Sequence, residues 1–158
     1  MSMDMQRFHA TLFEESREGL EAMEAGLLSL EQGSRDGDLI NSIFRAAHSI
    51  KGGAATFGFS DVAELTHKME SLLDRLRRHE ITPIPEMVDV LLESADASRS
   101  LLARHQAGGQ GEAISTHDPV RSISELASIG PRRMPRSKFS ATRSTLRLSR
   151  FSSALTSG

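Results

Sequence analysis

Residues 40–59 read INSIFRAAHSIKGGAATFGF, and this stretch decides the fold. Its apolar residues recur at steps of three and four, the spacing that gathers side chains on one stripe of an α-helix. The stripe consists of Ile40, Ile43, Ala47, Ile50, Ala54 and Phe57. At 100° per residue, His48 lies roughly 130° from the centre of this stripe. The stretch therefore predicts an amphipathic helix whose buried face excludes His48.

Three further stretches show the same period, at about 4–31, 62–76 and 87–102. Their stripes are Phe8, Leu12, Leu20, Met23, Leu27 and Leu30; then Val62, Leu65, Met69, Leu72 and Leu76; then Met87 or Val88, Leu91, Ala95, Ser98 and Leu102. Glycines or prolines break the pattern between them, and short connections favour antiparallel neighbours. We therefore predict an all-α fold, an antiparallel up-down four-helix bundle over residues 1–107.

The rest of the chain has a different composition. Residues 108–113 are expected to form a Gly-rich linker. A partial stripe of Val120, Ile123, Leu126 and Ala127 indicates a short fifth helix within 114–129. Residues 130–158 are rich in Ser and Arg without a sustained period, so we expect a disordered basic tail without chemistry of its own.

Charge and composition exclude several classes of function. Residues 1–107 hold 18 acidic and 11 basic side chains, a net charge of −7, whereas 108–158 hold 3 and 8, a net charge of +5, which together give the overall −2. An acidic bundle has no basic face for nucleic acid. The chain has no cysteine, so thiolate metal sites and disulfides are excluded. Without an apolar run of about 20 residues or a signal peptide, a cytoplasmic monomer that does not enter membranes is expected.

Helix geometry predicts a partner for His48 on the next helix. His48 lies nine residues before Phe57, or about 13.5 Å along the axis, and Glu70 lies ten residues after Ser60, or about 15 Å. If the chain reverses near Gly58, the two side chains are level. The same reasoning places Lys51 beside His67. We therefore expect His48, Lys51, His67 and Glu70 to share one patch across two helices.

Such a patch suits phosphoryl chemistry. A carboxylate that accepts a hydrogen bond from Nδ1 of His48 fixes the tautomer and leaves Nε2 as a nucleophile, while Lys51 offsets phosphoryl charge. Gly52 and Gly53 are unfavourable inside a helix, which indicates that a bare surface gives access to the site. The sequence has no Gly-rich nucleotide loop and no carboxylate pair for Mg²⁺. ATP and Mg²⁺ are therefore expected from partner domains, and this chain is expected to bind no cofactor and no metal.

Residues 48–59, HSIKGGAATFGF, resemble the phosphorylation motif of histidine phosphotransfer (HPt) domains. With His67-Lys68-Met69-Glu70, the chain is similar over residues 1 to about 105 to the N-terminal P1 domain of the CheA family of chemotaxis histidine kinases. The resemblance implies a five-helix bundle in which His48 accepts phosphate, Glu70 hydrogen-bonds its ring, and Lys51 and His67 complete the polar network. It further implies a histidine kinase ATP-binding domain as donor and response-regulator receiver domains as acceptors.

Full kinases of that family continue into regulator-binding, dimerisation, ATP-binding and coupling domains, whose sequence is not found here. We therefore expect no autonomous kinase activity from this chain. Two other functions stay open at this point. One is a helical docking adaptor without phosphate chemistry; the other is a metal-binding bundle that uses His48, His67 and Glu70, although bundle metal sites use inward-facing ligands and Glu-x-x-His pairs.

Overall fold

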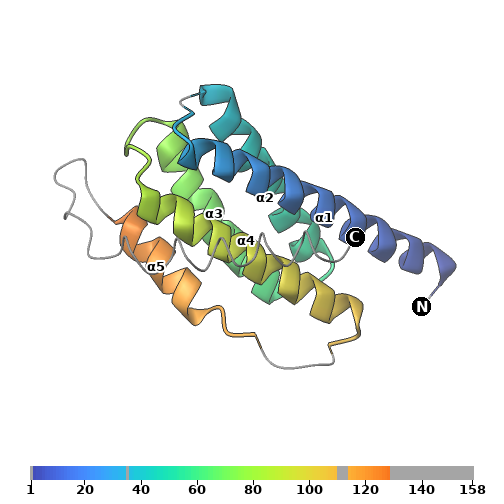
Figure 1. Cartoon of the computed structure of the whole chain (residues 1–158). Coiled ribbons are helices and arrows are strands. Elements are labelled where there is room, and N and C mark those ends of the chain that lie inside the picture. The colour runs from blue at the N-terminus through green and yellow to red at the C-terminus, as the bar shows by residue number, and fades with distance from the viewer. Residues whose placement is uncertain (1, 35, 110–113, 129–158) are drawn as a thin grey trace, which may run out of the picture.

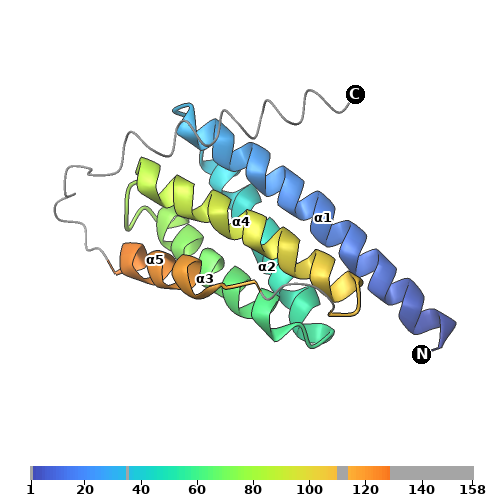
Figure 2. The ribbon, with the colours of Figure 1, turned by 60° about the horizontal axis from the view of Figure 1, so that its bottom comes forward.

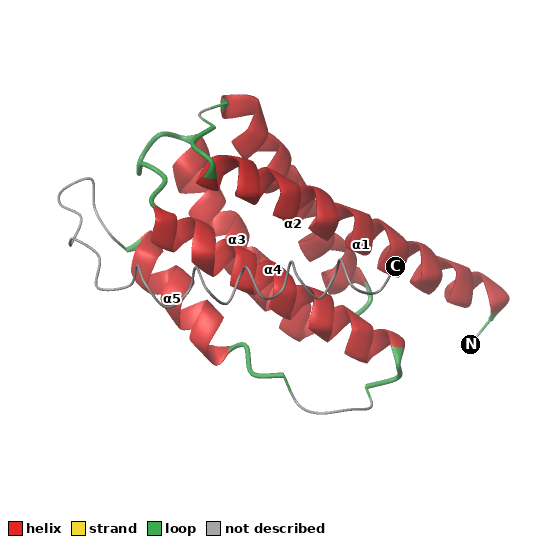
Figure 3. Ribbon diagram, in the orientation of Figure 1, coloured by secondary structure: helices red, strands yellow, loops and turns green. Residues whose placement is uncertain are grey.

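The computed structural model describes residues 2–34, 36–109 and 114–128, and these residues form five α-helices without a strand (Figures 1 and 3). The helices are α1 (Met3–Glu31), α2 (Gly37–Thr56), α3 (Ser60–Arg77), α4 (Pro85–Gln106) and α5 (His117–Ala127). The predicted all-α class is confirmed. Most of the predicted linker and all of the predicted basic tail, 130–158, lie outside the described residues. No helix in the described parts of the chain is long and apolar enough to cross a lipid bilayer.

The first four helices form a closed ring in which each packs on two neighbours: α1 on α2 and α4, and α3 on the same two (Figure 2). The predicted stripes of α2, α3 and α4 face the interior. From Ile40 to Ala54, from Val62 to Leu76 and from Met87 to Leu102, every stripe residue is at most 7% exposed. Phe57, at the end of α2, is half-buried. Burial of these three apolar faces against one another and against α1 is the main favourable contribution to the fold.

The prediction for Phe8 is wrong. This side chain was expected on the buried stripe of the first helix, but it is 62% exposed, whereas Leu12, one turn further, is 7% exposed. The reason is length: α1 has 29 residues and α2 has 20. The first turns of α1 extend past the ends of their neighbours, so that the helical period continues where there is no helix left to cover it (Figures 1 and 2).

The connection between α2 and α3 fixes how the two helices meet. Gly58 has a φ of +77°, which only glycine adopts without strain. The backbone N–H of Phe59 donates to the carbonyl of Ala54 at 2.8 Å, and that of Gly58 donates to Ala55 at 3.2 Å. These two bonds form a Schellman motif, which ends α2 and reverses the chain within a few residues. α3 therefore returns antiparallel along α2.

The fifth helix is part of the packed body. α5 lies on α3 and α4, and its Ile123 is only 1% exposed within the common core. Val120, Leu126 and Ala127 pack partly against the same core. Pro119 lies in the first turn, where its missing N–H costs no helical hydrogen bond. The packed structure thus extends beyond residue 107, where the sequence analysis placed the end of the bundle.

Candidate functional site

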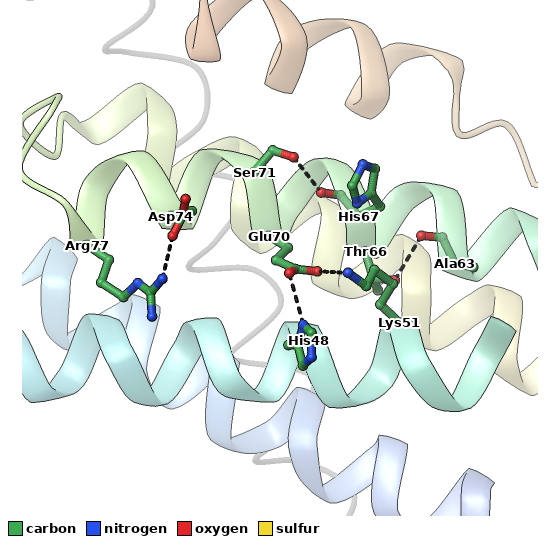
Figure 4. Close-up of polar contacts among 9 residues, drawn as sticks. All are labelled: His48, Lys51, Ala63, Thr66, His67, Glu70, Ser71, Asp74 and Arg77. Atoms are coloured by element: carbon green, nitrogen blue, oxygen red, sulfur yellow. Dashed lines mark hydrogen bonds and ion pairs between the residues drawn. The ribbon is translucent and has the colours of Figure 1, made fainter. Parts of the chain in front are cut away.

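His48 lies on the outer face of α2, beside α3 (Figure 4). Its side chain is 62% exposed, and its Nδ1 is 2.9 Å from Oε1 of Glu70. An ionised carboxylate only accepts hydrogen bonds, so Nδ1 donates this bond, and in the neutral ring Nε2 keeps its lone pair. Within the described residues, no hydrogen bond is made to Nε2. The site therefore presents one nucleophilic nitrogen to solvent.

Glu70 joins two side chains of α2 across the seam between α2 and α3. Its side chain is only 14% exposed; Oε1 accepts from His48, and Oε2 is 2.5 Å from Nζ of Lys51. Lys51 is 27% exposed and lies one turn after His48 on α2. The carboxylate thus has one partner for each oxygen, and both partners come from the neighbouring helix. This arrangement holds Glu70 in one rotamer.

Two opposing effects set the charge of Glu70. Burial on its own raises the pKa of the carboxyl group, because a charge is less stable away from water. Hydrogen bonds from Lys51 and His48, with the positive charges of both groups, outweigh burial and lower the pKa of Glu70 below its ordinary 4.5. The carboxylate is therefore ionised at neutral pH and accepts the Nδ1 hydrogen bond throughout that range.

The structure brings His67 to the same face but not into the hydrogen-bonded cluster. The His67 side chain is exposed, and its ring makes no hydrogen bond within the described residues; its backbone carbonyl accepts from Ser71 at 3.0 Å. The expected neighbour of His67, Lys51, instead forms an ion pair with Glu70. The long lysine side chain reaches across the seam to the mostly buried carboxylate of Glu70. The predicted contribution of His67 to the network stays a prediction.

The two glycines after His48 have different surroundings. A Cβ on Gly53 would overlap the Cδ1 of Leu12, so this glycine allows α1 to approach α2 closely. A Cβ on Gly52 would meet nothing within 4 Å. Gly52 lies four residues after His48 and therefore on the same side of the helix. Its missing side chain leaves the surface next to the imidazole bare.

A cleft continues from the site toward the end of α3. It is lined by Phe44, His67, Glu70, Ser71, Asp74, Arg77 and Arg78. The sequence analysis assigned no part in the site to Phe44 or to the two arginines. The spacing of Phe44, four residues before His48, could have indicated that the two rings lie on one side of the helix. No local feature of the sequence indicated that Arg77 would reach α2.

Metal binding at this site has little support in its geometry. No group of three or more His, Asp or Glu side chains within the described residues is placed to hold a metal ion. At the site itself, the second oxygen of Glu70 is paired with the Lys51 ammonium, which would repel a cation.

Comparisons with known proteins agree on one family. A family model described as Hpt domain matches residues 7–104. Chemotaxis protein CheA of Klebsiella aerogenes is 43% identical over 127 residues, covering 80% of this chain and 20% of that protein. The sensor histidine kinase CheAY of Helicobacter pylori is 33% identical over 129 residues, covering 79% and 16%. The chain thus spans about a fifth of the length of the curated relatives it matches.

Solved structures agree with this assignment. The phosphorylated P1 domain of CheA3 in complex with CheY6 from R. sphaeroides superposes with a TM-score of 0.72 at 26% identity, covering 77% of this chain and 96% of that one. The solution structure of the histidine phosphotransfer domain of CheA gives a TM-score of 0.69 at 31% identity, covering 83% and 99%.

The lowered pKa of Glu70 predicts how stability depends on pH. The unfolded chain binds a proton at Glu70 more readily than the folded chain does, so stability from this site is present above the ordinary pKa of 4.5 and is lost as pH falls below it. Urea unfolding of the natural chain and of Glu70→Gln at several pH values checks this. The difference in unfolding free energy between the natural chain and Glu70→Gln should be constant near neutral pH and should shrink below pH 4.5. A difference that grows with acidity would contradict it.

Proposed function

This chain belongs to the Hpt domain family, and from that premise we propose that His48 receives a phosphoryl group from a kinase ATP-binding domain and passes it to an aspartate of a response-regulator receiver domain. The observation that carries the proposal is the state of the His48 ring: Nδ1 donates to Glu70 at 2.9 Å, while the opposite nitrogen faces solvent. A phosphoryl carrier needs this combination of a fixed tautomer and an accessible nucleophile.

In the first step, the lone pair of Nε2 attacks the γ-phosphorus of ATP held by the kinase domain. An N–P bond forms as the bond from that phosphorus to the bridging oxygen breaks, and ADP leaves with the electron pair. The ring keeps its proton on Nδ1 and becomes a phosphorylated imidazolium. Glu70 is ionised and stabilises this positive ring through the same hydrogen bond.

In the second step, a carboxylate oxygen of the receiver aspartate attacks the phosphorus. The N–P bond breaks, its electron pair returns to Nε2, and the ring is again neutral with its proton on Nδ1. Lys51 keeps Glu70 in place by its ion pair and adds positive charge beside the phosphoryl group. Positioning and charge stabilisation are the main contributions a protein makes to phosphoryl transfer.

The relatives support both kinds of partner. The matched curated proteins are chemotaxis proteins CheA and a sensor histidine kinase, which supports a kinase as donor. The superposed P1 domain of CheA3 is phosphorylated and in complex with CheY6, which supports a receiver protein as acceptor. ATP and Mg²⁺ would come with these partners, and a cytoplasmic location would give access to both.

Incubation with the ATP-binding domain of a related CheA and radiolabelled ATP tests the proposal. The chain should acquire label that is labile in acid and stable in alkali, and His48→Gln should acquire none. The label should then move to a receiver domain. A matched control is His105→Gln, because His105 also has a carboxylate partner, Asp61 at 2.7 Å, but is only 26% exposed. Partner binding without label on His48 would favour the adaptor function.

Removal of the Glu70 carboxylate should lower the rate of phosphorylation more than removal of the Lys51 ammonium. Glu70→Ala should slow label incorporation about tenfold, equal to ~1.4 kcal/mol, because the tautomer and the imidazolium lose their support. Lys51→Ala should slow it only about two- to threefold, because a partly exposed ion pair contributes little. Single-turnover kinetics measures both rates, and circular dichroism checks that the variants keep the fold. Unchanged kinetics in Glu70→Ala would remove this residue from the mechanism.

A substitution at Gly52 should raise the stability of the chain and lower its rate of phosphoryl transfer. Gly52→Gln places a good helix former at an open position and should stabilise the chain by up to about 1 kcal/mol. The same side chain covers the approach to Nε2 and should slow both phosphorylation and transfer to a receiver. Ser42→Gln, at an exposed position of the same helix about 120° from His48, is the matched control. If both variants transfer as fast as the natural chain, Gly52 has no part in access.

A further inference from the structure

The hydrogen bond to Glu70 does not determine the orientation of the His48 ring plane. It fixes the position of Nδ1, but the ring can still swing about this contact, and the swing changes the direction of Nε2. The side chain is 62% exposed, so most of its surface has no neighbour to prevent this movement. In-line attack requires a defined direction for the lone pair. A second contact that restrains the ring plane would therefore matter for the reaction.

Phe44 provides such a contact. It lies one turn before His48 on α2, and the spacing of four residues places both rings on one side of the helix. The ring centroids are 6.1 Å apart, and the ring planes are inclined by only 16°. This is an offset parallel arrangement within the range in which aromatic rings attract each other. Phe44 is itself half-buried, so its ring is less free to move than that of His48.

Phe44 is held from the other helix. The guanidinium carbon of Arg77, on α3, lies 4.1 Å from the centroid of the Phe44 ring, within the range of a cation–π interaction. Arg77 is in turn held by Asp74, whose Oδ1 accepts from its Nη2 at 2.6 Å (Figure 4). Arg77 lies two turns after Glu70 on α3, so this helix contacts the His48 side of α2 at two successive levels.

We propose that Phe44 is a positioning residue for phosphotransfer, held in place by Arg77, and that it restrains the plane of the His48 imidazole so that Nε2 points away from the bundle. The inference rests on the proposed function of His48 and adds a residue to it. Two restraints then define the ring: Glu70 fixes one edge, and Phe44 limits the tilt of the plane. The aromatic neighbour also favours the positive ring that exists while phosphate is attached.

The test compares Phe44→Leu with Phe44→Tyr. Leucine keeps an apolar side chain but removes the aromatic ring; tyrosine restores the ring. With a CheA ATP-binding domain as donor, Phe44→Leu should lower the maximal rate of phosphorylation about three- to tenfold without raising the half-saturating donor concentration. Phe44→Tyr should recover most of the loss. Phe59→Leu is the matched control, because the Phe59 ring, just before α3, stacks on His105 of α4 with ring centroids 4.2 Å apart.

Arg77 tests the second half of the proposal. Arg77→Ala should slow phosphorylation about two- to threefold, and combining it with Phe44→Leu should add nothing, since Arg77 acts through Phe44. Arg75→Ala, which removes an arginine paired with Glu80 elsewhere on α3, is the control. Additive losses, or equal rates in Phe44→Leu and the natural chain, would overturn the proposal, as would equally slow Phe44→Leu and Phe44→Tyr.

A measurement on the unphosphorylated chain separates this inference from the proposed function. The ¹⁵N and ¹³C signals of the His48 ring report its tautomer and its motion by NMR. In Phe44→Leu, ring motion should increase while the Nδ1-protonated tautomer persists; in Glu70→Ala, which removes the acceptor, the tautomer should change. If the natural chain acquires no label on His48, the proposed function fails, yet the NMR comparison still decides whether Phe44 restrains the ring. Unaltered ring motion in Phe44→Leu would refute the restraint.

Discussion

The buried carboxylate of Glu70 is the interaction on which the site depends. It crosses from α3 to α2 with one partner for each oxygen, His48 at 2.9 Å and Lys51 at 2.5 Å. A carboxylate that is largely removed from water is unfavourable unless it is paired, so Glu70 requires both of its partners, the His48 N–H and the Lys51 ammonium, in register. That register exists because the Schellman motif at Gly58 reverses the chain within a few residues and because the apolar faces of α2 and α3 pack together. Fold and chemistry thus depend on the same helix pair.

The two adjacent glycines of α2, Gly52 and Gly53, have different surroundings, so that one turn of helix combines close packing with an open surface. Gly53 permits contact with α1 through Leu12, while Gly52 leaves open surface beside the reactive ring. Two adjacent residues on a helix point about 100° apart, so one can serve the interior and the other the exterior. The bundle is therefore closely packed at Gly53 and uncovered at Gly52, beside His48.

Much of this structure follows from the regular geometry of helices. Three of the four predicted stripes are buried, and the approach of His48 to Glu70 could be predicted because rise per residue and a short turn fix the level of both side chains. Local periodicity cannot show where a neighbouring helix stops, which is why Phe8 was misplaced. Nor does it show which partner a long side chain selects, as with Lys51, or which arginine on α3 reaches Phe44 across the seam.

The exposed position of the His48 ring on the outer face of α2 has a consequence for the proposed phosphoryl transfer. If His48 carries phosphate as proposed, a donor and an acceptor cannot contact Nε2 at the same time. Each transfer would then require the previous partner to dissociate first. Short residence times, and hence modest affinities for both partners, would follow from this geometry.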